Sequence, residues 1–251
     1  MKTIKTIAIP FAFFPYSITS RIVHWQTRHH GKVATLLKGA LRPKSPFLGE
    51  YELFSTSELL YLPRSGRTLH LAKECSLLQA RNGFRTHWRA MQTASALSAL
   101  FSRNLPEEAP DPALFGFYEE LLDLAEIYGD LPSFFFWAEL QVCTHLGHAP
   151  HFEHCIFCKA QEPHLFCIPS GGAVCSECAQ HNQLQTIPLS PDIRAILQAW
   201  QKNTRPQAAL KTRLTPTQHQ RIFHFLEAFL QEHLNLPPEI RQACSVFYSQ
   251  T

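Results

Sequence analysis

Long apolar runs are absent from this 251-residue chain: none approaches the roughly 18 consecutive residues that a transmembrane helix needs. The N-terminal stretch passes Pro10 and Pro15 and reaches Arg21 without a small-residue cleavage site, which argues against a secretory signal peptide. Four of the eight cysteines are scattered, which suits a reducing compartment better than a disulfide scaffold. We therefore expect a cytoplasmic protein with no membrane partner.

The short motifs of common enzyme classes are absent as well. The sequence has no P-loop Gly-x-x-x-x-Gly-Lys-Ser/Thr, no Gly-x-Gly-x-x-Gly, no Gly-x-Ser-x-Gly and no His-Glu-x-x-His. No carboxylate-rich nuclease pattern is evident, because the acidic residues cluster apart from the basic ones. We expect a protein without enzymatic activity, and we predict no catalytic residue.

Charge of one sign is missing from two long stretches. Residues 1–49 contain eight Lys or Arg and no Asp or Glu, whereas residues 107–139 contain nine acidic side chains and no basic one. The net charge is +11 over residues 1–103 and −8 over residues 104–251. This asymmetry predicts an anionic partner for the first part of the chain.

Two Cys-x-x-Cys pairs, Cys155/Cys158 and Cys175/Cys178, are separated by 16 residues. Two intervening residues allow a tight turn that aims both sulfurs at one point, and two such turns supply four soft ligands in a tetrahedron. This set suits one Zn²⁺ ion and leaves no coordination position open, so we predict a structural zinc site. A pair of disulfides or an unmetallated relic is the alternative, although no βαβ pattern of a redox fold surrounds the pairs.

Other potential ligands lie near these pairs. Cys167 is either a spare ligand or, as we favour, a small buried residue. With four cysteines already at the right spacing, we expect most of the nearby histidines to be surface or capping residues. These histidines are His145, His148, His151, His154 and His164.

Five short apolar runs in about the first 80 residues predict a small β-barrel. Turn signals separate them, among them Pro15-Tyr16-Ser17 and Arg64-Ser65-Gly66-Arg67. The commonest five-stranded barrel is the oligonucleotide-binding (OB) barrel, so residues 1–80 are predicted to form an OB-like nucleic-acid-binding domain. The runs lie at residues 4–9, 20–25, 33–37, 51–62 and 68–72.

Cations on such a barrel can follow phosphates, and rings such as Trp25, Phe47 or Tyr51 could stack on bases, although a Trp in an apolar strand is more often core. Further along, three arginines recur at every fourth position; if helical, they form a basic ridge that either extends the binding surface or is a solvated face. We predict nucleic-acid contacts for Arg21, Arg28, Lys32, Lys38, Arg42, Lys44, Arg81, Arg85 and Arg89.

From about Arg81 the apolar period changes to that of helices. Capping signals such as Asp111-Pro112 and Thr215-Pro216 mark several helix starts, and residues 134–142 are hydrophobic nearly all round, which predicts a buried helix. The predicted fold class is therefore α+β: the barrel of residues 1–80, then a helical domain of residues 81–251 with an inserted zinc ribbon at about 150–185.

Several motifs together resemble the RecO family of bacterial recombination mediators. The first is Thr27…Gly31-Lys32, followed by Lys38-Gly39-Ala40-Leu41-Arg42-Pro43-Lys44-Ser45. The second is Leu146-Gly147-His148-Ala149-Pro150 leading into Cys155-x-x-Cys158, and the third is Gly171-Gly172-x-x-Cys175-x-x-Cys178. The resemblance extends from the first strand to the last helix. It departs from the family at residues 15–20, where members usually carry a glutamate.

The resemblance implies a non-enzymatic, nucleoid-associated bacterial protein that binds single- and double-stranded DNA and anneals complementary strands. It implies that the protein acts with RecR to help load RecA onto DNA coated by single-strand-binding protein, in repair by the RecF pathway. It also implies the zinc-bearing type, with ligands Cys155, Cys158, Cys175 and Cys178. A zinc-ribbon RNA-binding or transcription-associated protein is the alternative, and a nuclease is the rival enzyme.

Overall fold

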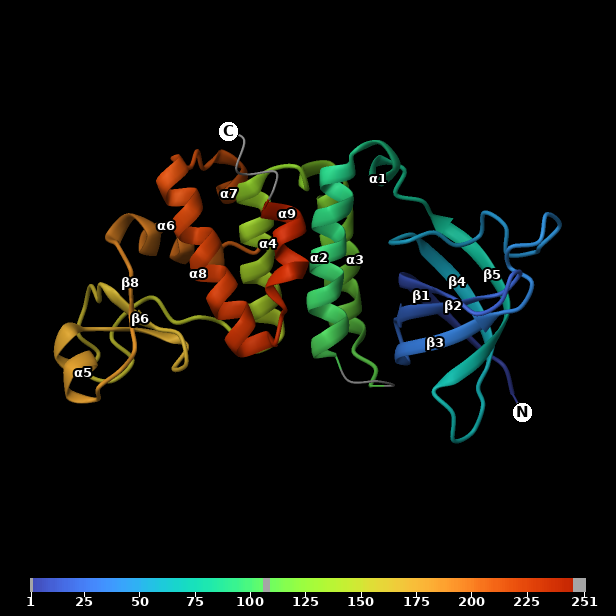
Figure 1. The fold of residues 1–251 in the computed structure, drawn as a ribbon, viewed down its shortest axis with the longest axis horizontal. Helices are drawn as coiled ribbons and strands as arrows, with labels where there is room; N and C mark the ends of the chain where they lie inside the picture. Colours follow the sequence, from blue (N-terminus) through green and yellow to red (C-terminus); the bar gives the residue numbers. More distant parts are fainter. Residues whose placement is uncertain (1, 106–108, 246–251) are drawn as a thin grey trace. The chain divides into compact units, whose positions relative to one another are not determined.

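The computed structural model describes residues 2–105 and 109–245, which form two compact units (Figure 1). In the described residues, the unit Met1–Ile127 contains a β-barrel and three helices. The unit Tyr128–Thr251 contains six helices and a small zinc-ribbon-like sheet in the described residues. The predicted α+β fold class is confirmed. The boundary between the units falls at the last residue of α3 (Pro112–Tyr128). The helices that directly follow the barrel therefore belong to the same unit as the barrel.

Five strands close into a barrel in the order β1-β2-β3-β5-β4. Neighbouring strands are antiparallel except β3 and β5, which run parallel. This confirms the predicted five-stranded barrel, although the first and last strands extend well beyond the predicted runs. The strands are β1 (Ile4–Pro15), β2 (Arg21–Thr27), β3 (Gly31–Leu37), β4 (Thr56–Leu62) and β5 (Leu69–Gln79).

The strand directions give the barrel two distinct ends. At one, which we call the Lys2 end, the start of β1 lies with the β2–β3 turn and the β4–β5 turn. At the other, the Thr19 end, the β1–β2 turn meets the segment that follows β3. Two hydrogen bonds join them: the Leu41 N–H donates to Thr19 O at 3.0 Å, and the Gly39 N–H donates to Ser20 Oγ at 3.1 Å.

Large rings fill the barrel interior. Trp25 is 0% exposed, and its Nε1–H donates to Thr35 Oγ1 at 2.8 Å, which satisfies the one polar atom of the ring. Phe47 and Tyr51 pack into the same core cluster. Trp25 is therefore a core residue, as its place in an apolar strand predicted. The suggestion that Phe47 and Tyr51 stack on bases is wrong, because a small closed barrel needs large side chains to fill its interior.

Three helices complete the barrel unit: α1 (Gly83–Thr86), α2 (Trp88–Asn104) and α3. The Ser98 hydroxyl and the Tyr118 hydroxyl lie 2.7 Å apart and join α2 to α3. The predicted ridge of three arginines does not form on one helix. Arg81 precedes α1, and the chain turns at His87, with φ −108° and ψ 83°, before Arg89 in α2.

In the second unit, the predicted buried helix is α4 (Pro132–His145), whose residues 133–143 are all buried. It packs against α6, α7 and α8. Thr215 and Gln218 form the predicted capping box at the start of α8. The helices around α4 are α6 (Pro191–Lys202), α7 (Gln207–Lys211), α8 (Pro216–Leu234) and α9 (Pro238–Ser245). In the described part of the chain, no helix is long and apolar enough to cross a membrane.

A buried ion pair ties α9 to α4. The Arg241 guanidinium donates to both oxygens of Glu139, at 2.6 and 2.8 Å, and also to the carbonyl of Phe223 at 3.0 Å. The two side chains are 1% and 0% exposed. Sequence reasoning missed this pair, whose members lie 102 positions apart.

We predict that Arg241→Ala lowers the free energy of unfolding by about 3–5 kcal/mol, because it leaves the Glu139 carboxylate buried without a counter-charge. Urea unfolding measures this loss. Lys202→Ala is the matched control, since it breaks an exposed pair with Glu153 and should cost less than about 1 kcal/mol. A similar small loss in both variants would contradict the structural role of the buried pair.

Candidate metal centre and nucleic-acid surface

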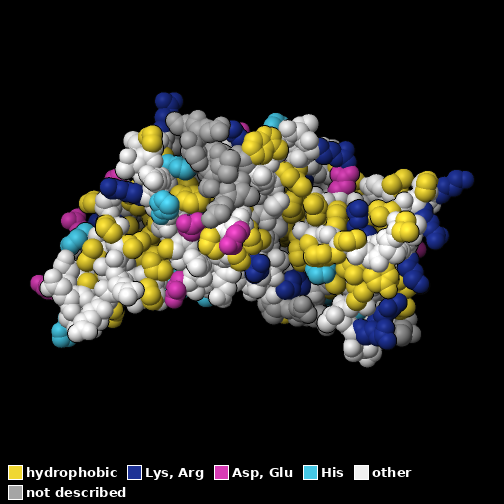
Figure 2. All heavy atoms as spheres, viewed as in Figure 1, with side chains coloured by type: hydrophobic (Ala, Val, Ile, Leu, Met, Phe, Trp, Pro, Cys, Tyr) yellow, Lys and Arg dark blue, Asp and Glu magenta, His cyan; other side chains and the backbone are white. Residues whose placement is uncertain are grey.

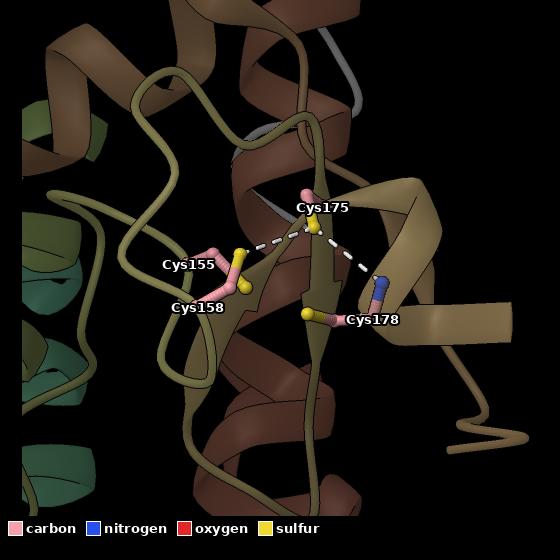
Figure 3. A group of neighbouring side chains, drawn as sticks. All are labelled: Cys155, Cys158, Cys175 and Cys178. Carbon is pink, nitrogen blue, oxygen red and sulfur yellow. Dashed lines mark hydrogen bonds between the residues drawn. The ribbon is translucent and has the colours of Figure 1, made fainter. Parts of the chain in front are cut away.

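The four cysteines of the two Cys-x-x-Cys pairs converge on one point (Figure 3). Their Sγ atoms all lie within 4.8 Å of one another, and those of Cys158 and Cys175 are 3.6 Å apart. Cys155 is buried, Cys158 is exposed, and Cys175 and Cys178 are half-buried. The predicted convergence is therefore confirmed.

Local backbone structure aims each pair. The Lys159 N–H donates to Cys155 O at 2.9 Å and closes the first turn. In the second pair, Cys175 caps α5 (Ser176–His181), and its sulfur accepts the Cys178 N–H. Between the pairs, β6 (Leu165–Cys167) and β7 (Gly172–Val174) form a sheet with β8 (Ile187–Pro188). A Cβ at Gly172 would come within 2.3 Å of Ile156, so only glycine allows the two pairs to approach this closely.

The sulfurs differ in how readily they ionise. Burial raises the pKa of Cys155, but hydrogen bonds with the backbone of Cys158, Cys175 and Phe157 more than offset this and lower it to about 6. The neighbouring thiols of Cys158 and Cys175 raise the pKa of Cys178 to about 12. Four crowded thiolates repel one another, and a bound cation removes that repulsion. The donor set therefore fits a metal ion.

Nearby residues do not join this set. Cys167 is 2% exposed, and its Sγ–H donates to Ser170 Oγ at 3.2 Å. His164 lies 2.9 Å from the Ser176 hydroxyl, and His151 packs against the ring of His154. Among the described residues, the four cysteines are the group that could hold a metal ion.

The nine predicted nucleic-acid contacts divide into three sets according to their partners. Lys38, Arg42 and Lys44 are exposed at the Thr19 end and form no ion pair with a described carboxylate. The Arg42 side chain lies over Gly39, whose φ is +68°. Figure 2 shows Lys and Arg side chains gathered over the part of the molecule that carries the barrel.

The second set is paired with other residues of the barrel unit. Arg81 is 5% exposed; its guanidinium donates to Asp123 at 2.7 Å and also to the carbonyl of Phe54. Its role is therefore structural, and it is not part of a solvent-facing ridge. The Arg28 guanidinium lies 3.3 Å from Glu119, Arg85 pairs with Glu52, and the Lys32 ammonium donates to the carbonyl of Ser102 at 2.8 Å.

Two further predicted residues lie against aromatic rings. The Arg21 guanidinium is 5.0 Å from the centre of the Phe13 ring. Burial raises the pKa of Tyr51, and the positive charge of Arg21 partly lowers it again. The Arg89 guanidinium is 5.6 Å from the centre of the Trp88 ring, which is 56% exposed.

Sequence reasoning missed an exposed apolar group beside Lys38, Arg42 and Lys44 at the Thr19 end. Ile18 is 96% exposed and Tyr16 is 57% exposed, both in the β1–β2 turn, and Leu41 across from them is 46% exposed. The signal was present in the sequence, because apolar residues inside a proline-flanked turn have no strand partner to cover them.

We predict that Cys175→Ser abolishes binding of the one metal ion per chain and lowers the melting temperature, because metal binding at such sites contributes folding free energy. Metal content of the purified protein, measured by atomic emission, checks this. Cys167→Ser should keep the metal, since Cys167 lies outside the set. Equal metal content in the two variants would contradict the assignment of the ligands.

Comparison with known families agrees with this architecture. The model described as "Recombination protein O N terminal" matches residues 1–81, and "Recombination protein O C terminal" matches residues 85–241. Proteins named DNA repair protein RecO are similar to this chain. The one from Exiguobacterium sibiricum is 30% identical over 169 residues, which are 67% of each chain.

The relative from Bacillus subtilis is 26% identical over 183 residues, 72% of this chain and 71% of the relative. The relative from Bacillus pumilus is 22% identical over 254 residues, 98% of this chain and 88% of the relative. The barrel, the helical unit and the four-cysteine centre thus occur in a chain whose two parts both match models of one family. The chain belongs to the recombination protein O (RecO) family.

Proposed function

We propose that this chain is a DNA-binding recombination mediator without enzymatic activity. It binds single- and double-stranded DNA, anneals complementary strands, and acts with RecR to help load RecA onto DNA coated by single-strand-binding protein. Membership of a family whose relatives are named DNA repair proteins supports the repair context. The single observation that carries DNA binding is the set of exposed cations at the Thr19 end that pair with no described carboxylate.

A cation can hold a phosphate only if no carboxylate of the same fold already neutralises it. Lys38, Arg42 and Lys44 meet this condition among the described residues, since the ion pairs of the barrel unit involve other cations. No acidic residue occurs in the first 49 positions, so the turns and segment that form this end add no repulsion toward a phosphate backbone.

Annealing requires a surface that holds strands by their phosphates and leaves the base edges free to pair. Lysine and arginine side chains in exposed turns supply such contacts, which carry no sequence information. The exposed Tyr16, Ile18 and Leu41 lie within the same end and offer apolar contacts to unstacked bases. They take the role that sequence analysis had suggested for Trp25, Phe47 and Tyr51.

The ion in the four-cysteine centre is proposed to be zinc, which when bound ties the two Cys-x-x-Cys turns together without an open coordination position. The centre then stabilises the ribbon and contacts no substrate. The described part of the ribbon, residues 150–185, carries Lys159 and three glutamates, Glu153, Glu162 and Glu177, so its charge disfavours DNA.

We predict that the triple variant Lys38→Glu/Arg42→Glu/Lys44→Glu binds single-stranded DNA about 100-fold or more weakly at physiological salt and loses strand annealing. The slope of log affinity against log salt should fall by about 2, roughly 0.7 for each lost contact. Fluorescence anisotropy of a labelled 20-mer oligothymidine, titrated at several salt concentrations, measures both quantities.

The matched control is Arg205→Glu/Lys211→Glu/Arg213→Glu, which makes the same change of net charge at exposed positions of the other unit. Its affinity should stay near that of the wild type. If both triple variants lose affinity equally, net charge alone explains the binding and the Thr19 end is not the DNA surface. Tighter binding to the RNA 20-mer of the same sequence, or cleavage of DNA with Mg²⁺, would favour a different function.

A further inference from the structure

The four cysteines of the metal centre differ in their exposure to solvent. Cys155 is 0% exposed and belongs to the small core of the ribbon, whereas Cys175 and Cys178 are half-buried. Cys158 is exposed, and Phe157 beside it is 47% exposed, so the first Cys-x-x-Cys turn presents Cys158 at its tip. A reagent in solution therefore meets Cys158 before it meets the other three cysteines.

A sulfur of the second turn lies close to that of Cys158. The Sγ atoms of Cys158 and Cys175 are 3.6 Å apart and are joined by a dashed line in Figure 3. A disulfide bond is about 2.05 Å long, so an approach of about 1.5 Å is enough to form one. The Cys178 N–H donates to the Cys175 sulfur at 3.4 Å and holds it at the start of α5. The exposed first turn is thus the part that moves when such a bond forms.

Three other described cysteines are shielded from the same reagent. Cys75, Cys143 and Cys167 are 5%, 0% and 2% exposed. Burial raises the pKa of Cys75 to about 12, and burial also raises the pKa of Cys143, so both are neutral thiols at neutral pH. The reactive form of cysteine is the thiolate, and a thiol that binds a metal ion is deprotonated. Oxidation of these described cysteines is therefore directed to the four-cysteine centre.

The ribbon is attached to α8 by contacts that do not involve the four cysteines. Phe152 and Phe166 are 1% and 0% exposed, and their rings pack on Phe225 of α8 with ring centres 5.6 and 4.9 Å away. Nε2 of His233, also in α8, lies 2.7 Å from the carbonyl oxygen of Ile168. These contacts keep the ribbon on α8 when the bonds among the sulfurs change.

Main-chain hydrogen bonds keep the two Cys-x-x-Cys turns beside each other. The Ile156 N–H donates to Ala173 O at 3.0 Å, which joins the first turn to β7, directly before the second turn. The Cys155 N–H donates to Ala160 O at 2.9 Å and closes the base of the first turn. The sulfurs therefore stay within reach of one another without a bound ion.

We propose that Cys158 and Cys175 form a reversible oxidation site, at which a peroxide converts the two thiolates into one disulfide. The Cys158 thiolate attacks one oxygen of hydrogen peroxide and becomes a sulfenic acid, while the O–O bond breaks and hydroxide leaves, to be protonated to water. The Cys175 thiolate then attacks the Cys158 sulfur, the S–O bond breaks, and a second hydroxide leaves and is protonated. The two sulfurs together lose two electrons, which the peroxide gains.

This disulfide removes two of the four donors from the centre. The two thiolates that are left, Cys155 and Cys178, cannot complete a tetrahedral site, so oxidation lowers the affinity for the ion and the stability that the ion gives to the ribbon. A dithiol reverses the step by thiol–disulfide exchange, and the attached ribbon can then bind the ion again. The inference rests on the metal binding proposed above and is independent of DNA binding by the barrel.

The test treats the full chain, loaded with Zn²⁺, with hydrogen peroxide. Fragmentation of the unreduced peptides by mass spectrometry identifies the disulfide, and a chromophoric indicator measures the released Zn²⁺. We expect a Cys158–Cys175 disulfide, one Zn²⁺ released for each disulfide formed, and recovery of both thiols and of metal binding after dithiothreitol and Zn²⁺ are added. A disulfide within either Cys-x-x-Cys pair, or oxidation of Cys75 and Cys143 as fast as of the centre, overturns the proposal.

Two matched variants separate the roles of the sulfurs, because each removes one ligand from the second turn. Cys178→Ser keeps both reacting sulfurs and should still form the Cys158–Cys175 disulfide. Cys175→Ser should stop at the sulfenic acid of Cys158, which the reagent dimedone labels. Equal labelling of Cys158 in the two variants would show that Cys175 does not complete the reaction.

The outcomes also separate this inference from the proposed metal centre. A chain that binds no Zn²⁺ contradicts the metal centre, and the disulfide is then mapped in the metal-free chain, where its absence overturns the oxidation site as well. A chain that binds Zn²⁺ and keeps it, with all four thiols intact, at peroxide concentrations that oxidise free cysteine overturns the oxidation site alone. The metal centre then stands as a purely structural site.

Discussion

Competition between phosphate and carboxylate for each cation determines what the barrel unit can bind. Where a glutamate or aspartate of the same fold reaches an arginine, that arginine stabilises the unit, as Arg81 does with Asp123 and Arg28 with Glu119. Where none does, the charge stays available to a polyanion. The acidic helix α3 lies within this unit, and its carboxylates pair with the arginines near it. These paired arginines are structural, and the cations without such a partner are the candidate binding residues.

Two groups of cations without a described carboxylate partner lie at the two ends of the barrel. The Thr19 end has Lys38, Arg42 and Lys44 next to exposed apolar side chains, and the Lys2 end has the arginines of the β4–β5 turn around a cavity. Turns at the ends of a closed barrel point into solvent, so charged side chains there can stay exposed. The four-cysteine centre belongs to the other unit, where we propose that it stabilises the ribbon.

Local patterns predicted the parts of the molecule that depend on local chemistry. Alternation and turn signals identified the five strands, and the spacing of Cys155, Cys158, Cys175 and Cys178 identified their convergence, because two residues between cysteines fix the local geometry. The capping box at Thr215 could likewise be predicted from the sequence, since its two partners lie three residues apart.

Features that depend on residues far apart in the chain could not be predicted from the sequence. Glu119 lies 91 positions from Arg28, and Glu139 lies 102 positions from Arg241, so no sequence window contains either pair. The same limit explains the misplaced rings. Phe47 and Tyr51 follow a basic stretch that suggests a surface, but the packing of the closed barrel turns them inward. The cavity at the Lys2 end combines residues from four separate segments, and only the topology brings them together.

The central claim is that DNA is held by the barrel unit and not by the four-cysteine ribbon. Hydrogen–deuterium exchange of the full chain, with and without a 20-mer oligothymidine, tests it most directly. We predict slower exchange in residues 16–20 and 38–50, with no change in residues 150–185. Protection confined to the ribbon, with unchanged exchange in the barrel, would contradict the account.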